Sequence, residues 1–168
     1  MTPTDLYLDL LIRTIANTIY GDAPADPWSG GAYLDGLRGD GRDWPSQAHS
    51  MVGVKRLTNL RDLCLRTIEA GTPGDFVETG VWRGGACILM RGVLAALGDT
   101  SRKVIVADSF EGLPPPRPEA YPADAGDTHH TYAQLAIGLD QVKTHFAAYG
   151  LLDGQVEIPG TGLGYFVA

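Results

Sequence analysis

The sequence predicts an α/β fold, and two neighbouring stretches carry this prediction. A short apolar strand over residues 76–78 runs into a turn that contains Gly80, Gly84 and Gly85, and an apolar helix follows over residues 86–97. A second strand over residues 103–107 then ends at Asp108. Strands that alternate with helices in this way are typical of α/β proteins.

The turn between the first strand and its helix has the features of a small-molecule crevice. Glycine lets a backbone approach a ligand closely because no Cβ intervenes. The N-terminus of the following helix is expected to offer unpaired N–H groups to an acidic ligand group. Asp108, at the end of the second strand, suits a ribose diol, because a carboxylate accepts two hydroxyl hydrogen bonds.

Glu78 decides between classes of ligand. A dinucleotide fingerprint is G-x-G-x-x-G, whereas this chain has Glu78-x-Gly80-x-x-x-Gly84. A carboxylate there repels a pyrophosphate, which disfavours a nicotinamide-dependent oxidoreductase. It suits a cationic ligand, such as the amino group and sulfonium of S-adenosylmethionine. Together with Asp108, the pattern indicates a methyltransferase cofactor site; the alternative is an ordinary strand-to-helix turn in another α/β protein.

Length, charge and cysteine content argue against several other classes of function. A chain of 168 residues is one domain by the usual length prior. Its net charge of −7 argues against binding to nucleic acid or an anionic membrane, which favour basic patches. The apolar stretch from Leu6 to Ile19 is interrupted by charged residues, so we expect no signal peptide and a cytoplasmic location. Cys64 and Cys87 are expected to be buried thiols rather than a disulfide or metal pair.

The other elements follow in chain order. A helix over residues 4–20 is capped by Thr4 or Asp5, and residues 21–45 form a long loop. Ser46 is a possible helix cap, and a strong helix covers residues 54–70. After the central strands come a proline-rich loop, a helix over residues 139–149, and the start of a third strand from Leu151.

Two loops carry candidate ligand contacts. Trp28, Tyr33 and Trp44 in the first loop either cover a ligand or pin the loop to the core. The segment 121–132 contains two aspartates and the adjacent His129 and His130. Such a segment is more often a solvated surface or a substrate lid. The alternative is that these side chains bind a divalent metal ion.

Five stretches together resemble the macrocin O-methyltransferase (TylF-like) family, whose members methylate sugar hydroxyls on macrolides and related antibiotics. They are YLDLLIRT (7–14), GRDWPSQAH (41–49), ETGVWRGGACILMR (78–91), ADSFEGLP (107–114) and YPADAGDTHHTY (121–132). These motifs are long and contiguous, so they are far more specific than the glycine pattern alone.

The resemblance implies the N-terminal part of a Rossmann-like S-adenosylmethionine fold. Residues 1–70 would form N-terminal helices and a lid, and residues 75–158 the cofactor-binding half of the sheet, within one domain. The implied function is S-adenosylmethionine-dependent methylation of a sugar hydroxyl on a glycosylated natural product. The family also implies Mg²⁺ and a homo-oligomer assembled through N-terminal segments.

The resemblance implies a set of cofactor contacts in three places. Met51 approaches the cofactor from the lid side, and the 121–132 loop lies near the acceptor sugar. The residues at the methionine end are Glu78, Thr79, Gly80, Val81, Trp82, Gly84 and Gly85. Those at the ribose and adenine are Asp108, Ser109 and Phe110.

The chain also departs from the family pattern. The family's metal-binding and base aspartates follow later strands, and residues 1–168 supply no evident trio, so no catalytic or metal-ligating residue is assigned. Where family members continue with a Pro-Gly-Trp-Phe-like segment, this chain has PGTGLG (159–164). We therefore expect a domain that is truncated at its C-terminus, and we hypothesise that a frameshift in the gene caused the truncation. The alternative function is an inactive remnant that at most binds cofactor or pairs with other subunits.

Overall fold

The computed structural model describes residues 1–159, so the departure expected over 159–164 lies almost entirely outside the described residues. The helices are α1 (Pro3–Ile15), α2 (Asp35–Asp40), α3 (Gly53–Glu69), α4 (Gly85–Leu97) and α5 (Leu139–Ala148). The strands are β1 (Phe76–Thr79), β2 (Val104–Ala107) and β3 (Val156–Glu157). The main helices and strands therefore lie within a few residues of their predicted ranges, except at α1, α2 and β3, which begins at Val156 rather than Leu151.

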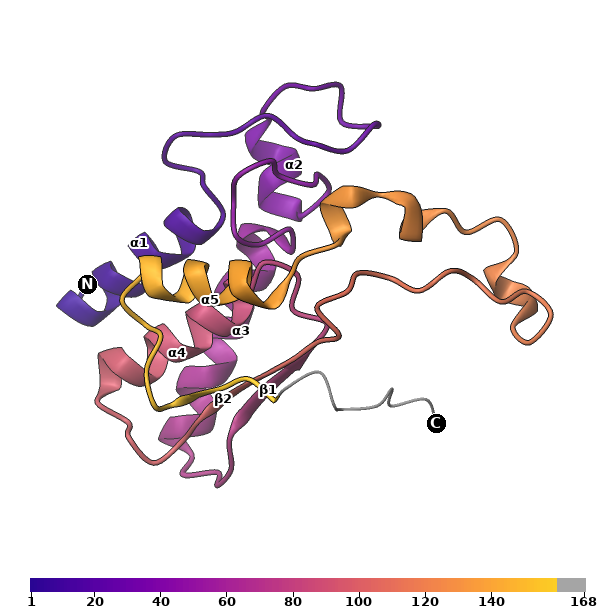
Figure 1. Cartoon of the computed structure of the whole chain (residues 1–168). Helices are drawn as coiled ribbons and strands as arrows, with labels where there is room; N and C mark the ends of the chain where they lie inside the picture. The colour runs from indigo at the N-terminus through magenta and orange to yellow at the C-terminus, as the bar shows by residue number, and fades with distance from the viewer. Residues whose placement is uncertain (160–168) are drawn as a thin grey trace.

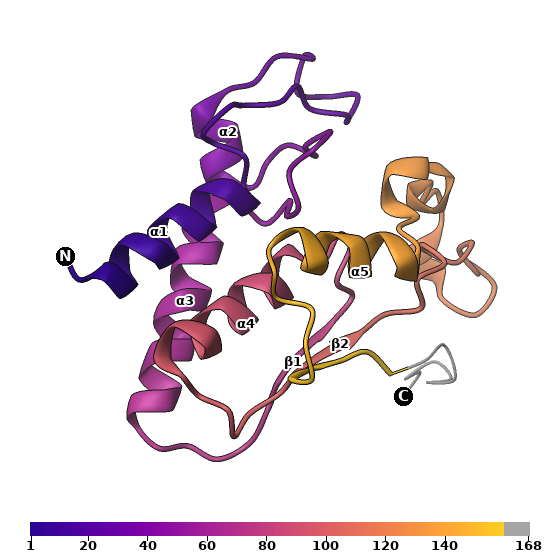
Figure 2. The same ribbon diagram turned by 60° about the vertical axis from the view of Figure 1, so that its left-hand side comes forward.

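The three strands form a parallel sheet in the order β1-β2-β3. Phe76 pairs with Val104 and Thr79 with Ala107, and Val104 pairs with Val156 on its other side. The chain moves in the same direction across the sheet from β1 through α4 to β2 and from β2 through α5 to β3. Right-handed crossovers therefore place both helices on the same face of the sheet. Figures 1 and 2 show the helices gathered on that side. The predicted α/β fold is confirmed.

The core lies between that face of the sheet and the helices. Val104 and Val106 are fully buried there, whereas Val77, which points to the opposite face, is 59% exposed. Helix α4 is apolar on all sides, and ten consecutive residues, from Gly85 to Leu94, are buried. A Cβ at Gly92 would lie 2.3 Å from Leu11 Cδ2, so α4 packs closely against α1 and a larger residue there would require Leu11 to move. Cys64 and Cys87 are buried and free, as predicted.

Helix α1 differs from its prediction at both ends. Its cap is Thr2, whose hydroxyl accepts the Asp5 N–H at 3.1 Å while the Asp5 carboxylate accepts the Thr2 N–H at 2.7 Å. The predicted cap at Thr4 or Asp5 was therefore wrong. The helix ends at Ile15 rather than residue 20 because Asn17 adopts φ 49° and donates its side-chain amide to Asp22. Ser46 caps no helix; its hydroxyl also donates to Asp22.

A buried ion network organises the loop over residues 21–45, which contains the short helix α2 that the sequence did not predict. Arg38 is 1% exposed and bonds Asp22 through Nη1 at 2.8 Å and Asp43 through Nη2 at 2.9 Å. Its Nη1 also donates to the Ala16 carbonyl. Burial raises the pKa of Asp22, but hydrogen bonds from Gln47 N–H and Arg38 outweigh this, so the pKa lies below its usual value.

The aromatic residues of this loop have separate roles. Tyr33 lies against the Arg38 guanidinium, 5.2 Å from ring centroid to Cζ, and so helps to pin the loop. Trp28 and Trp44 pack edge-to-face on each other at 4.7 Å, and Trp44 packs on Tyr132 at 5.3 Å. The two tryptophans therefore join the loop to the segment 121–132, which projects beyond the carboxyl end of β2 (Figure 1).

His49 fastens the segment that follows this loop onto α4 and α5. Its carbonyl accepts the Gly85 N–H at 2.9 Å, and its ring stacks on His145 at 4.1 Å between centroids. The Tyr149 hydroxyl lies 2.9 Å from His49 Nδ1. Burial, helped by His145 and Arg83, lowers the pKa of His49 to about 4, so the ring is neutral near pH 7.

Replacing Arg38 with Met should strongly destabilise the fold, because it leaves the carboxylates of Asp22 and Asp43 buried without their cation. Breaking a buried pair by removing one partner costs about 3–5 kcal/mol. Urea unfolding at pH 7 measures the change in the free energy of unfolding. Arg42→Met is the matched control, since Arg42 is exposed in the same segment. Similar losses in both variants would contradict a special role for Arg38.

His49 should make stability depend on pH between about 6.5 and 4. Its folded-state pKa lies below its unfolded value of 6.5, so the unfolded chain binds the proton more readily and stability falls as the pH drops through this window. The decline should be shallower in His49→Asn than in the parent chain, by on the order of 2 kcal/mol. His130→Asn, at an exposed position, controls for loss of a histidine. Parallel stability curves for His49→Asn and the parent would refute this assignment.

Candidate functional site

The glycine turn after β1 has an unusual backbone conformation. Gly80 and Gly84 adopt φ 81° and 85°, and Trp82 between them adopts φ 49°. A left-handed non-glycine residue costs on the order of 1–3 kcal/mol and persists where its surroundings enforce it. Here the Trp82 indole N–H donates to the Gln134 carbonyl at 2.8 Å, and the Arg83 guanidinium lies 4.3 Å from its ring centroid. Strain held in this way is a common property of functional turns.

Asp108 joins this turn to the one that follows β2. Its Oδ2 accepts the Val81 N–H at 2.7 Å, and its Oδ1 accepts the Phe110 N–H at 2.9 Å. Phe110 also has a positive φ, of 58°. A carboxylate oxygen has two lone pairs, so each oxygen of Asp108 retains capacity for a further donor. One carboxylate thus shapes both turns and still suits a ligand diol.

Glu78 brings a second carboxylate to the same end of the sheet. Its Oε2 accepts a hydrogen bond from the Cys87 thiol in the first turn of α4, with Sγ and Oε2 3.0 Å apart. Burial raises the pKa of Glu78, hydrogen bonding from Cys87 opposes that rise, and the negative charge of Asp108 adds to it. A carboxylate at this place also interacts favourably with the positive end of the α4 dipole.

At the N-terminus of α4, the Gly85 N–H is not one of the unpaired donors that the sequence led us to expect. The Gly85 N–H donates to the His49 carbonyl, and a Cβ on Gly85 would lie 2.4 Å from that oxygen. The protein's own carboxylate, Glu78, faces this helix end. The charge that the site presents is therefore negative, as expected for a cationic ligand.

The remaining predicted residues surround the same two turns. Thr79, Gly80 and Ser109 are exposed, and the space beside the Cα of Gly80 is open for 4 Å. Val81 and Phe110, by contrast, are 5% and 8% exposed members of the core. Their side chains therefore pack inward.

Two further predicted residues lie at the edges of the site. Gly84 packs against α5, where an added Cβ would lie 3.1 Å from Val142 Cγ1. Met51 is partly buried, two residues beyond His49 and just before α3. The predicted residues thus gather at the carboxyl ends of β1 and β2, where ligands bind in open α/β sheets.

Sequence reasoning missed Arg83 and Gln134. Arg83 Nη1 donates to the carbonyls of Pro45 and Ala48, so it ties the glycine turn to the segment before α3. Gln134 bridges the turn and the first loop, accepting from Trp82 and donating to the Ala25 carbonyl at 3.3 Å. A charged residue inside a glycine turn was a usable signal for Arg83. No sequence signal marks Gln134, because its backbone carbonyl is the acceptor.

Residues 1–159 contain no group of three or more His, Cys, Asp or Glu side chains that could hold a metal ion. Asp127 and His129 contact each other, with Oδ1 and Nδ1 2.5 Å apart, on an exposed surface. The described residues therefore do not fit the Mg²⁺ that the resemblance implied.

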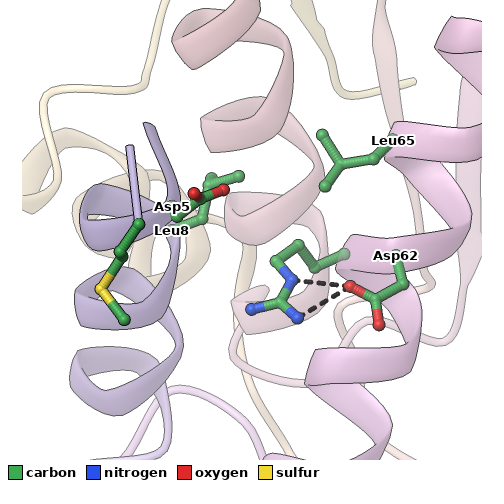
Figure 3. A pocket seen from close by; sticks show the side chains of 6 residues that line it. Asp5, Leu8, Asp62 and Leu65 are labelled. Atoms are coloured by element: carbon green, nitrogen blue, oxygen red, sulfur yellow. Dashed lines mark hydrogen bonds and ion pairs between the residues drawn. The ribbon is translucent and has the colours of Figure 1, made fainter. Parts of the chain in front are cut away.

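A pocket of about 440 Å³ lies away from the glycine turn, between α1 and α3. Figure 3 shows Asp5 and Leu8 on one side and Asp62 and Leu65 on the other. Arg61, which also lines the pocket, forms an ion pair with Asp62 at 2.8 Å. All the residues that line this pocket belong to the N-terminal part of the chain. No helix in the described part of the chain combines the length and apolar character needed to cross a membrane.

Comparison with known proteins places this geometry in context. The chain is 51% identical over 160 residues to an 8-demethyl-8-(2,3-dimethoxy-α-L-rhamnosyl)-tetracenomycin-C 4′-O-methyltransferase of Streptomyces olivaceus, covering 93% of this chain and 61% of that protein. It is 46% identical to a demethyldecarbamoylnovobiocin O-methyltransferase of Streptomyces niveus, covering 94% and 62%. It is also 46% identical to a mycinamicin III 3″-O-methyltransferase of Micromonospora griseorubida, covering 95% and 65%.

The structural comparison agrees. The solved structure of the O-methyltransferase NovP matches with a TM-score of 0.85 and 46% identity, covering 92% of this chain and 63% of that one. The chain therefore spans between three fifths and two thirds of the length of these relatives. The model of the family described as macrocin-O-methyltransferase (TylF) matches residues 4–166, almost the whole sequence, and the chain belongs to that family.

Proposed function

We propose that this chain forms the S-adenosylmethionine-binding part of an O-methyltransferase that acts on a sugar hydroxyl of a glycosylated natural product. The observation that carries the proposal is the convergence of two carboxylates, Glu78 and Asp108, on a strained glycine turn at the carboxyl ends of β1 and β2. Family membership supports methyl transfer to oxygen. The rhamnosyl 4′-oxygen in one relative's name supports a sugar as the acceptor.

The proposed roles follow from the chemistry of each group. Glu78 pairs with the cationic methionine end of the cofactor, and Gly80 leaves open space for it. Asp108 accepts hydrogen bonds from the ribose hydroxyls with the lone pairs that Val81 and Phe110 leave free. The other proposed cofactor contacts are Met51, Thr79, Val81, Trp82, Gly84, Gly85, Ser109 and Phe110, of which Val81 and Phe110 contribute mainly backbone.

The acceptor side of the site is proposed to lie where the first loop meets the segment 121–132. Trp44 packs on Tyr132, and Gln134 connects Trp82 of the glycine turn to Ala25 of the loop. Loop, segment and turn therefore meet beside the cofactor site. Such a closure excludes water and holds the acceptor oxygen in line with the transferred methyl group, and positioning of this kind is a large part of catalysis.

The proposal assigns no catalytic base and no metal ligand to residues 1–159, which bring no metal-binding group together. The alternative is a chain that binds cofactor, or pairs with other subunits, without transferring a methyl group itself. Self-association through the N-terminal helices belongs to the same proposal. It is supported by Leu6 and Leu10, which lie one turn apart on α1 and are each 55% exposed.

Glu78→Gln should weaken the binding of S-adenosylhomocysteine by about tenfold to a hundredfold, the usual loss for one hydrogen bond to a charged group. Calorimetric titration of the purified chain measures this, with Glu78→Ala as a second variant. Glu69→Gln, at an exposed position near the end of α3, is the matched control and should bind like the parent. Unchanged binding in Glu78→Gln would contradict the role of Glu78, and no saturable binding by the folded parent would contradict the cofactor site.

Gly80→Ala should impair binding for a different reason. Gly80 and Gly98 both have a positive φ, 81° and 64°, and open space where a Cβ would project. Alanine at either position therefore meets the same left-handed strain of about 1–2 kcal/mol. Only at Gly80 does the new methyl group enter the proposed ligand space. Both variants should lose similar thermal stability, while Gly80→Ala alone loses affinity for S-adenosylhomocysteine; equal affinities would refute the placement of the ligand.

A further inference from the structure

We propose that Cys87 is a positioning residue for Glu78, and that its thiol orients the carboxylate which meets the cationic end of the cofactor. This inference rests on the proposed function for its consequence in binding. The interaction itself is observed independently of that proposal, because Cys87 Sγ lies 3.0 Å from Glu78 Oε2.

The location of Cys87 makes its thiol an effective donor. The residue is fully buried in the first turn of α4, inside the core cluster, where water does not compete for the hydrogen bond. Burial raises the pKa of the Cys87 thiol well above its usual value, and the carboxylates of Glu78 and Asp108 raise it further. The thiol therefore stays protonated near pH 7 and donates a hydrogen bond to the Glu78 carboxylate. A thiol bonded to a carboxylate is a charge-assisted donor, which strengthens an otherwise weak bond.

Cys87 is also the neighbour that favours an ionised Glu78. Strand β1 packs against β2, which Asp108 directly follows, and against α4, which carries Cys87. Burial and the Asp108 charge both raise the pKa of Glu78, whereas the hydrogen bonds from Cys87 lower it. Loss of the thiol therefore leaves burial and the Asp108 charge opposed only by the hydrogen bond from the backbone N–H of residue 87.

The consequence is a defined pH dependence. A cationic ligand pairs with ionised Glu78, so binding should weaken as the pH falls through the Glu78 pKa. Without the thiol that pKa rises, and the weakening begins at a higher pH. A residue that only fills space would change stability and leave this midpoint where it was.

The first experiment needs no cofactor. Carboxyl NMR titration of Glu78, assigned with Glu78→Gln, is carried out on the parent, Cys87→Ala and Cys87→Ser between about pH 4 and pH 8. We expect the Glu78 midpoint to rise by about half a unit or more in Cys87→Ala and to return towards the parent value in Cys87→Ser, whose hydroxyl restores a donor. Cys64→Ala removes the other buried thiol and should leave the midpoint unchanged. A Cys87→Ala midpoint equal to that of the parent would overturn the proposal.

The second experiment tests the consequence for binding. S-adenosylhomocysteine is titrated calorimetrically into the same variants across the same pH range. Cys87→Ala should bind several-fold more weakly at the acidic end and approach the parent at the alkaline end, while Cys87→Ser follows the parent. Equal weakening in the alanine and serine variants at every pH would overturn the positioning role. If the NMR midpoints move as expected and the parent binds no cofactor, the proposed function fails and the thiol–carboxylate interaction stands.

Discussion

The hydrogen bonds from Val81 and Phe110 to the Asp108 carboxylate are the constraint on which the site depends. Parallel strands bring the turns after β1 and β2 to one edge of the sheet, but each turn contains a residue in the left-handed region, Trp82 or Phe110. Neither conformation is favourable alone. Because one carboxylate accepts from both turns, the hydrogen bonds to this shared acceptor offset the strain in each turn and hold the backbone beside the open space at Gly80.

The loops reach this edge through buried polar groups rather than through apolar packing. Arg38 gathers Asp22 and Asp43 at the base of the first loop, and Arg83 holds the next segment by its carbonyls. A buried ion network is weak evidence for stability, because desolvation offsets much of its attraction. Its contribution here is geometric, since the Arg38 guanidinium bonds Asp22, Asp43 and the Ala16 carbonyl at once and so fixes these three segments relative to one another. The loop is thereby placed where Trp44 meets Tyr132 beside the glycine turn.

The elements predicted correctly from the sequence are those whose signal is local. The strand 76–78, its glycine turn and the apolar helix after it read directly from a few consecutive residues, and Glu78 marked the site by replacing a glycine. The end of α1 was missed because apolar periodicity continues to Ile19, while the left-handed backbone of Asn17 and its side-chain hydrogen bond to Asp22, which is itself held by Arg38, end the helix. His49 was missed as a packing residue because its partner Tyr149 lies 100 residues further along the chain. Such pairings exist only after the sheet has formed.

The charges at this edge of the sheet favour a cationic ligand over an anionic one. Glu78 and Asp108 are like charges at the end of one sheet, and their repulsion, added to burial, raises the pKa of Glu78. A pyrophosphate would add negative charge to this arrangement, whereas a cation relieves it. In the proposed function, a bound cation offsets the repulsion between these two carboxylates. The proposal thus makes Glu78 the residue that suits this sheet edge to a cationic ligand, and it makes the Cys87 thiol, whose Sγ lies 3.0 Å from Glu78 Oε2, the group that favours an ionised Glu78.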